Sequence, residues 1–427
     1  SFGARDIQRY GSEGTFLKLN DLIDKYMPNF KALLNDMDDL RKGLPTVDGS
    51  IYSLPGLSDC LEIELNPKIY LNKKFMDNVG VQMPTTTEEF YNVLKAMRDK
   101  DANKNGKKDE IPLTSNSWTN IRNAFFGAFG LMNRGSSHTN YDIDPKTGEL
   151  RFIPTAPEFR QMLEYLNKLY TEQLIDNEIF TIKTANVTAK VEMDLVGGIV
   201  HTNTTMAGTT YVDDFTGLTE ALEGPNGDKL WTAKRGHMST KGGFVMTSTN
   251  PYPEATARWM DYWFTDEGSK LFYLGVEGES FYVTEDGKYE FIPEKIEEAT
   301  GSTYDEKVSK FTPYAGGGSP VLALPKYFKG AELLPIPAKA AADLNKYTPK
   351  EIWGMFNFTD EESTELASLE TDIFTGYYNN VVPEFITGKR PINDETWNEY
   401  VAKYETMGLK RMTEIYNNGL QRYKAIK

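Results

Sequence analysis

The sequence is short of the residues that build disulfides and metal centres. It has one cysteine, Cys60, and three histidines, His138, His201 and His237, in 427 residues. A single cysteine excludes an intramolecular disulfide and a cysteine-built zinc site, and it fits either the cytosol or a bacterial surface. The histidines are far apart and form no HExxH pairing, so neither a histidine-rich metal centre nor a histidine-based triad is expected.

Positive charge and long apolar runs are also scarce. The formal charge of −15 and a pI near 4.9 argue against nucleic acid, and they disfavour a polyanionic ligand unless a local basic cluster overrides them. The longest apolar runs, such as 197–200 and 321–324, fall well below the roughly 18 residues of a membrane span. The chain begins without Met or a leader pattern, so we expect that a signal segment was removed or that the sequence starts inside its gene.

Aromatic residues, by contrast, are abundant. They make up 12% of the chain, with 24 Tyr, 23 Phe and 6 Trp. Most of these rings are expected in the core. A surplus of Tyr and Trp is typical of surfaces that stack on sugars or bases, and because the charge disfavours nucleic acid, sugars are the favoured ligand class.

Helical and strand patterns alternate along the chain, which predicts an α/β protein, and the length predicts two lobes. Strands are expected at 50–54 and 68–72, with an irregular stretch between them. Helices are expected at 19–26, after Thr85, at 156–174, after Pro253, and almost continuously from 359 to the end. Trp259 and Trp263 are predicted to pack in the core because they lie four residues apart on an amphipathic helix. Trp397 is expected to be structural as well.

One short segment carries the strongest chemical signal. Oxygen-bearing side chains recur at Asp101, Asn103, Asn105 and Asp109, with Gly106 where a loop must turn sharply. This spacing matches the first nine positions of an EF-hand-type calcium loop, in which position seven, here Lys107, contributes its carbonyl. Pro112 replaces the usual glutamate at position twelve, and Glu110 is the carboxylate available to complete the shell. The alternative is an ordinary polar turn; a single loop of this kind predicts a structural calcium ion rather than a switch.

Six segments of the sequence have the pattern of one known family. They are DANKNGKKDEIPL, GSEGTFLKLNDLIDKYMPN, DGSIYSLPG and MPTTTEEFYNVLKAMRDKD, and later NPYPEATARWMDYWFTDEGSKLFYLGVEGESFYV and VVPEFITGKRPINDETWNEYVAKYETMGLKRMTEIYNNGLQRY. In these segments the sequence resembles the family 1 extracellular solute-binding proteins of ABC transporters. These segments span nearly the whole chain. More narrowly, the chain is similar to the lipoprotein-type branch of Gram-positive bacteria, which is related to alginate- and oligosaccharide-binding members.

The resemblance implies a periplasmic-binding-protein-like fold of type II, with two α/β lobes joined by hinge crossings and a helical C-terminal region. The expected division is 1–60 in the first lobe, 61–241 in the second lobe with the calcium loop, 242–310 back in the first, and 311–427 mostly helical, in the second lobe and hinge. It also implies calcium ligation by the side chains of Asp101, Asn103, Asn105, Asp109 and Glu110 and the carbonyl of Lys107. Compared with the family, the chain starts inside the first lobe, on the order of a hundred residues late, after the signal, the lipid-anchoring cysteine and some cleft residues.

Ligand-facing residues are expected where the chain crosses between the lobes. By analogy, the first crossing should fall within 55–67, the second near 241–247, and the third between 282 and 325. The candidate sugar-binding residues are Asp59, Glu62, Trp118, Trp231, Arg235, Tyr282, Tyr314 and Trp353. The alternatives are a solvated loop for the two carboxylates and core packing for the rings.

The sequence therefore predicts the sugar-capturing subunit of an ABC importer, without catalytic activity. It would be a monomer, held by a lipid anchor at the outer face of the cytoplasmic membrane of a Gram-positive bacterium, with permease subunits as partners. The alternative is a calcium-stabilised glycoside hydrolase or polysaccharide lyase, because 62 Asp and Glu residues leave room for a catalytic pair. A third possibility, a cell-surface adhesion module, would explain the aromatic residues but not the two lobes. The net charge weakly favours a neutral oligosaccharide over uronates.

Overall fold

Two small sheets organise the chain. The structure is a computed structural model that describes residues 2–208, 210–299, 304–310, 312–313 and 319–426. The first sheet has β1 (Ser53–Ser58) at its centre, antiparallel to β7 (Met238–Val245) and parallel to β10 (Leu322–Ala323). The second has β2 (Lys68–Asn72) at its centre, antiparallel to β5 (Gly198–His201) and β6 (Phe215–Gly217). We call the halves built on these sheets the first and second lobes.

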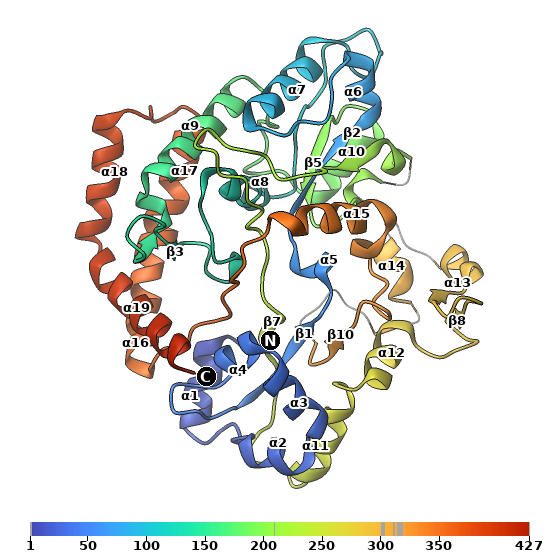
Figure 1. Ribbon diagram of the computed structural model, residues 1–427, viewed down its shortest axis with the longest axis vertical. Coiled ribbons are helices and arrows are strands. Elements are labelled where there is room, and N and C mark those ends of the chain that lie inside the picture. The colour runs from blue at the N-terminus through green and yellow to red at the C-terminus, as the bar shows by residue number, and fades with distance from the viewer. Residues whose placement is uncertain (1, 209, 300–303, 311, 314–318, 427) are drawn as a thin grey trace.

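Each sheet carries its own helices, as Figure 1 shows at the two ends of the long axis. The first lobe contains α1 (Ala4–Ser12), α2 (Asn20–Tyr26), α3 (Pro28–Asp36), α4 (Asp38–Gly43), α11 (Pro253–Tyr262), α12 (Asp266–Leu274), the hairpin of β8 (Phe281–Val283) and β9 (Tyr289–Phe291), α13 (Pro293–Glu298) and α14 (Tyr304–Val308). The second lobe contains α6 (Lys73–Val79), α7 (Thr87–Asp99), α8 (Trp118–Phe125), the hairpin of β3 (Tyr141–Ile143) and β4 (Leu150–Phe152), α9 (Pro157–Thr171), α10 (Thr184–Glu192) and α15 (Pro335–Leu344).

The C-terminal region is helical and runs along one side of both lobes (Figure 1). It consists of α16 (Asp360–Glu370), a π-helical stretch (Thr371–Tyr378), α17 (Asn379–Ile386), α18 (Asp394–Thr406) and α19 (Leu409–Ala425). Short 3-10 turns occupy Phe126–Phe129, Ser136–His138, Ile153–Thr155, Thr205–Ala207, Val212–Asp214, Ala331–Leu333 and Asn345–Tyr347. Among the described residues, no helix combines the length and apolar composition needed to cross a membrane.

Local sequence accounts for several helix boundaries. The hydroxyl of Thr86 accepts a hydrogen bond from the Glu89 amide at 3.1 Å, and the Glu89 carboxylate accepts one from the Thr85 amide at 2.8 Å. The first bond satisfies an amide that the first turn of α7 leaves unpaired, and the second satisfies the Thr85 amide just before the helix. A full capping box between Thr359 and Glu362 starts α16 in the same way.

Separate apolar cores support the two lobes. Leu19, Phe30, Leu40 and Leu57 belong to the core of the first lobe. The core of the second lobe includes the buried face of α9, Phe159, Met162, Leu163, Leu166 and Leu169, and continues into α17, α18 and α19. Each such side chain, fully buried, contributes about 1.5–3 kcal/mol. The C-terminal helices therefore share one core with the second lobe.

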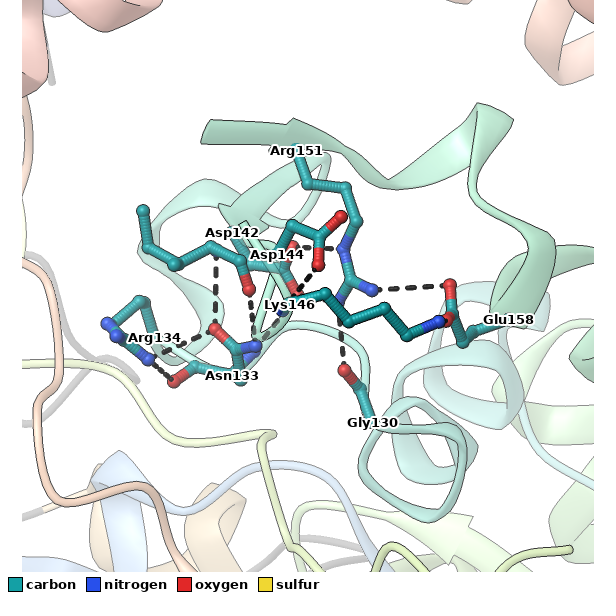
Figure 2. A network of polar contacts seen from close by, with 9 residues as sticks. Gly130, Asn133, Arg134, Asp142, Asp144, Lys146, Arg151 and Glu158 are labelled. Atoms are coloured by element: carbon teal, nitrogen blue, oxygen red, sulfur yellow. Dashed lines mark hydrogen bonds and ion pairs between the residues drawn. The ribbon is translucent and has the colours of Figure 1, made fainter. Parts of the chain in front are cut away.

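A buried ion-pair network fastens the β3–β4 hairpin to α9 (Figure 2). The Arg151 guanidinium donates to the Asp142 carboxylate at 2.7 and 2.8 Å, to Glu158 at 3.3 Å and to the Gly130 carbonyl at 2.9 Å. The Asp142 side chain is fully buried and that of Arg151 is 9% exposed. Every part of the guanidinium fork has a partner, which is the condition under which a charge is tolerated in a core.

Some sequence-based expectations need correction. The strand predicted at 50–54 lies at Ser53–Ser58, so part of the stretch expected to be irregular is strand. The amphipathic helix after Pro253 ends at Tyr262, and Trp259 on it is 59% exposed instead of buried. Helical spacing placed Trp259 on the apolar side, but the core lies against Ala257 and Met260. Trp397 is 7% exposed, as expected for a structural ring.

Candidate functional site

Two segments that connect the lobes lie side by side. The first follows β1 through α5 (Leu61–Glu64) to β2, and the second is the stretch 232–237 that leads into β7. The Asn66 amide donates to the Ala233 carbonyl at 2.8 Å, and the Arg235 amide donates to the Glu64 carbonyl at 3.0 Å. The second crossing was expected near 241–247, but the structure has β7 there, paired with β1.

The remaining connections also differ from the expected division of the chain. After the β8–β9 hairpin the chain returns to the first sheet as β10, and only then passes through Ala331–Leu333 to α15 in the second lobe. β7 spans the boundary expected at residue 242, and β10 lies beyond the boundary expected at residue 311. Both strands nevertheless belong to the first sheet. Strand pairing over long separations, which no local pattern encodes, decides these positions.

Arg235 and Glu64 bring opposite charges to the paired crossings without forming an ion pair. The Arg235 side chain donates one hydrogen bond, to the Gly236 carbonyl at 3.3 Å, and it is only partly exposed. Burial lowers the pKa of Arg235, and the negative charges of Glu64 and Asp39 oppose that effect. Glu64 is 8% exposed, and burial raises its pKa against the positive charges of His237, Lys234 and Arg235. One carboxylate oxygen of Glu64, Oε1, is buried and has no hydrogen-bond partner among the described residues.

A second pair of charged groups flanks the crossing. The His237 Nδ1 and the Asp39 Oδ1 are 2.7 Å apart, and the His237 amide donates to the other carboxylate oxygen at 2.7 Å. The hydrogen bond to Asp39 raises the pKa of His237 although burial opposes it. Burial alone would raise the pKa of Asp39, but the contacts with His237 lower it overall. This pair fixes the start of α4 to the residue that precedes β7.

The two carboxylates predicted in the first crossing are accessible. Asp59 is exposed and Glu62 is partly exposed. The Asp59 amide is tied to the Ala323 carbonyl at 2.9 Å, and the Glu62 carbonyl accepts from the buried Lys68 ammonium at 3.0 Å. Their side chains are thus held near the crossing by the backbone and remain available to a ligand.

The predicted aromatic residues are scattered. Trp231 and Trp353 are 2% and 1% exposed; Trp231 packs in the second-lobe core and Trp353 against Phe356. Trp118 is partly buried at the start of α8, 5.1 Å from the Phe180 ring. Tyr282 is 41% exposed on the β8–β9 hairpin, and Tyr314 lies outside the described residues. Burial of Trp231 and Trp353 favours packing over stacking on a ligand.

The segment 101–110 forms a compact loop. Asp101 accepts from the Asn105 and Gly106 amides at 2.9 and 2.8 Å, and Asn105 accepts from the Lys107 amide at 2.7 Å. Gly106 has φ 79°, the left-handed conformation that glycine adopts most easily. One Glu110 oxygen accepts from the Ala102 amide at 2.7 Å, and the other is buried without a partner in the part of the chain that the structure describes.

The donor set of this loop fits a hard cation. No three His, Cys, Asp or Glu side chains within the described ranges are close enough to form a metal site by themselves. A calcium ion would therefore depend on the amide oxygens of Asn103 and Asn105 and on a carbonyl as well as on carboxylates, which is the mixed oxygen set that calcium accepts. A cation held in this loop would supply the partner that the buried Glu110 oxygen lacks among the described residues.

A hollow in the surface lies away from the paired crossings and is not taken as the candidate sugar site. It has a volume of about 580 Å³ and is lined by the β3–β4 hairpin and α19, with Leu150, Thr413 and Gln421 among its residues. No residue of the two paired crossings lines it.

Glu64, Asp39 and His237 were not predicted as site residues. Glu64 follows the predicted Glu62 on the same short helix, so its place on the crossing was accessible to sequence reasoning. The burial of Glu64 could not be predicted from the sequence. The pairing of Asp39 with His237 could not be predicted either, because these two residues are far apart in the chain.

The chain is similar to known sugar-binding transport proteins. No protein-family model matches it. It is 26% identical over 444 residues to the fructooligosaccharide ABC transporter substrate-binding protein FusA of Streptococcus pneumoniae serotype 4, covering 99% of this chain and 79% of that protein. It is also 26% identical over 222 residues to Lipoprotein LipO of Bacillus subtilis, covering 49% of this chain and 42% of that protein.

Solved structures share the fold. FusA in complex with kestose matches with a TM-score of 0.75 at 24% identity, covering 99% of this chain and 86% of that one; an EF-hand mutant of FusA has also been solved with fructo-nystose. The alginate-binding protein AlgQ2 without calcium matches with a TM-score of 0.78 at 22% identity, covering 98% and 84%. The fold is thus periplasmic-binding-protein-like of type II, as the resemblance implied.

Proposed function

We propose that this chain, a homologue of the family 1 extracellular solute-binding proteins along almost its whole length, is the substrate-binding subunit of an oligosaccharide ABC importer. The observation that carries the proposal is the similarity to FusA over 99% of the chain. Its relatives are substrate-binding components of transporters and not enzymes. The similarity thus favours a binder over the glycoside hydrolase or lyase considered from sequence.

The paired crossings are the proposed sugar-binding region. Asp59, Glu62 and Arg235 supply polar groups there from segments that join the two lobes, and the sugar hydroxyls both donate and accept hydrogen bonds. Of the predicted rings, Trp118 and Tyr282 retain exposed surface that a sugar can contact. Movement of the lobes about these crossings would enclose the ligand, and permease subunits would bind the closed form better than the open form.

Calcium is proposed as a structural ion. Asp101, Asn103, Asn105, Asp109 and Glu110 would hold it with the Lys107 carbonyl. The ion would neutralise the carboxylates and fix the loop that follows α7. Support comes from the loop conformation, from the unpartnered Glu110 oxygen and from the EF-hand that is named in a FusA structure.

We propose an extracellular location on a Gram-positive bacterium, with a lipid anchor and a monomeric state. The organisms of FusA and LipO, and the description of LipO as a lipoprotein, support this location. Comparing the membrane-bound fraction of the full-length gene product with that of a variant without its anchoring cysteine tests the anchor. Sedimentation of the folded chain tests whether it is a monomer in solution.

Calorimetric titration with a panel of neutral and acidic oligosaccharides tests the function, with the mixtures examined afterwards for cleavage. Binding of one glycan that remains intact is the expected result. Cleavage of a glycan would contradict the binding-protein proposal and favour the glycoside hydrolase or polysaccharide lyase. Binding without a change in molecular shape, measured by solution scattering, would favour an adhesion module.

A further inference from the structure

Main-chain amides of the 101–110 loop hold three of its proposed calcium ligands. The side-chain oxygens of Asp101, Asn103 and Asn105 accept hydrogen bonds from amides two to five residues later, at 2.7–3.0 Å. An amide or carboxylate oxygen has two lone pairs, so each of these oxygens keeps one for a cation. Calcium takes oxygen ligands of this kind. The loop backbone therefore fixes part of the proposed ligand set by itself.

Asn103 differs from the other two ligands because it also has a partner outside the loop. Its Nδ2 donates to the main-chain carbonyl of Asp194 at 2.9 Å, whereas Nδ2 of Asn105 donates to Asp109 within the loop at 3.0 Å. An amide side chain has a donor end and an acceptor end. Because the Asp194 carbonyl holds the donor end of Asn103, its Oδ1 is turned towards the loop, where it accepts from the Asn105 amide.

The Asp194 carbonyl has a fixed position because its segment is bonded to the end of the loop. The Asp194 amide donates to the Val191 carbonyl of α10 at 2.8 Å. The Ile111 amide, one residue beyond the loop, donates to the Leu195 carbonyl at 2.7 Å, and the Gly197 amide donates to the Ile111 carbonyl at 2.9 Å. This segment leads directly into β5, which pairs with β2. The second-lobe sheet thus positions the carbonyl that holds Asn103.

The backbone conformation of Asp194 directs this carbonyl. Asp194 has φ 57°, in the left-handed region that glycine adopts easily, that Asp and Asn tolerate, and that β-branched residues avoid. Its carboxylate lies elsewhere, 3.2 Å from the Lys74 ammonium. The main-chain carbonyl can therefore be tested separately from the side chain.

We propose that Asp194 is a positioning residue for the calcium ion, whose main-chain carbonyl holds the Asn103 amide so that its Oδ1 faces the ion. The ion is then bound at a place that depends on β5 as well as on the loop. Asp194 does not belong to the ligand set proposed from the sequence, and its carboxylate is not needed for this role. The inference rests on the proposed calcium ion and is independent of the identity of the sugar.

Two substitutions of Asp194 separate the carbonyl from the side chain. Asp194→Gly and Asp194→Val both remove the carboxylate and its contact with Lys74, but only glycine keeps the backbone conformation without strain. Gln173→Val is the control for strain alone, because Gln173 is exposed, has φ 58° and follows α9 in the same lobe. Thermal melts in chelator establish that each variant is folded.

Two quantities are measured on the full chain: the calcium affinity by calorimetric titration, and the number of waters on a bound terbium ion from luminescence lifetimes in H2O and D2O. Asp194→Val should lose about tenfold to a hundredfold in calcium affinity, the range for losing a partner that orients a metal ligand. Its terbium ion should gain about one water, which replaces the Asn103 oxygen. Asp194→Gly should retain the affinity and the water number, and Gln173→Val should match the unmodified protein.

A second pair of variants tests the same contact from the side of the loop. Asn103→Asp and Asn105→Asp each add one charge to the ligand set, which by itself strengthens calcium binding. In Asn105→Asp the new carboxylate faces Asp109, and a bound ion relieves their repulsion. In Asn103→Asp one new oxygen faces the Asp194 carbonyl, and the ion does not relieve that contact. Asn105→Asp should therefore bind calcium at least about tenfold more tightly than Asn103→Asp, which corresponds to about one hydrogen bond.

The outcomes separate this inference from the proposed ion and from the proposed function. If calcium binds and Asp194→Val matches Asp194→Gly, or Gln173→Val loses as much affinity as Asp194→Val, the positioning role is wrong and the calcium site stands. Equal calcium affinities of Asn103→Asp and Asn105→Asp would also overturn the role. If the unmodified protein binds neither calcium nor terbium, the ion and this inference fall together. The sugar titrations test the transport function separately.

Discussion

Two arginines at low exposure show how differently the protein uses the same side chain. Arg151 in the β3–β4 hairpin contacts Asp142, Glu158 and the Gly130 carbonyl (Figure 2). The Arg235 guanidinium at the lobe crossings has a single hydrogen bond within the described residues, to the neighbouring Gly236 carbonyl. Folding alone explains Arg151, because all of its guanidinium nitrogens have hydrogen-bond partners. Folding alone does not explain Arg235, and this difference points to a ligand at Arg235.

The same contrast applies to carboxylates. Asp142 is fully buried and has Arg151 and the Asn133 amide as partners. Glu64 and Glu110 each have one buried oxygen with no partner. Burying an unsatisfied polar atom costs about 1–3 kcal/mol, so folding alone does not explain these two oxygens.

The largest expected effect is on stability, through the ion-pair network of Arg151, Asp142 and Glu158. Arg151→Met should reduce the free energy of unfolding by about 3–5 kcal/mol, because it leaves Asp142 buried without its cation. Denaturant unfolding measures the change. Lys146→Met is the matched control: Lys146 is 79% exposed in its pair with Glu158, and its loss should change stability by less than about 0.5 kcal/mol. Equal effects of the two variants would contradict the distinction between saturated and exposed cations.

Calcium should produce the next largest effect. At a calcium concentration a hundred times its Kd, the protein should gain about 2.7 kcal/mol, seen as a higher melting temperature that a chelator reverses. Glu110→Gln should abolish most of that gain, because it removes the charge next to the unpartnered oxygen. Asp99→Asn, an exposed change just before the loop, should leave the calcium response intact. A melting temperature that is the same with calcium and with chelator would refute the ion site.

Arg235→Met should separate binding from stability. We expect its free energy of unfolding to stay within about 1 kcal/mol of the unmodified protein, because no ion pair is broken. Its affinity for the sugar should fall by about tenfold to a hundredfold, since hydrogen bonds to charged groups contribute about 1.5–3 kcal/mol. Unfolding curves and calorimetry measure the two quantities. A destabilisation as large as that of Arg151→Met would show that Arg235 is structural.

The smallest effect concerns the Asp39–His237 pair. The raised pKa of His237 adds stability that is complete below its unfolded pKa of about 6.5 and is lost as pH rises through the folded pKa. The lowered pKa of Asp39 adds stability that is present above about 3.8 and is lost as pH falls through the folded pKa. The pair should thus be most stabilising between about pH 4 and 6.5.

Unfolding of the unmodified protein and of His237→Asn at pH 5.5 and 8.5 checks this prediction. The difference between the two proteins should shrink at the higher pH by less than about 1 kcal/mol, because His237 is more than one third exposed and solvent screens the pair. His237 also faces Glu64 and Asp59, so the same experiment on Glu64→Gln shows how much of the effect belongs to Asp39. A pH-independent difference would contradict the assignment.

Much of the architecture followed from local sequence. The cap of α7 at Thr86, the turn at Gly106 and the apolar face of α9 all depend on residues within a few positions of each other. Helix caps and loop turns are short-range hydrogen-bond patterns, so their signals survive without tertiary information. The chain length predicted two lobes, and the whole-chain resemblance added the type of fold, which the solved structures support.

The candidate site was predicted less completely. Arg235, Asp59 and Glu62 were assigned to it from their place in the chain, but Trp231 and Trp353 are buried in packing. The local sequence around an aromatic side chain does not distinguish a ring that faces a ligand from one that packs in a core. Only the packing of distant segments decides which, and the same reason explains why Trp259 is exposed.

The sequence by itself determined the α/β class, the spacing of oxygen ligands in the 101–110 loop and the acidic, aromatic-rich character that favours sugars. Tertiary structure alone decided that Glu64 lies beside Arg235, that Asp39 meets His237, and that the first sheet is completed by β10. These contacts join residues far apart in the chain. Their formation depends on which lobes and strands pack together, and no local spacing carries that information.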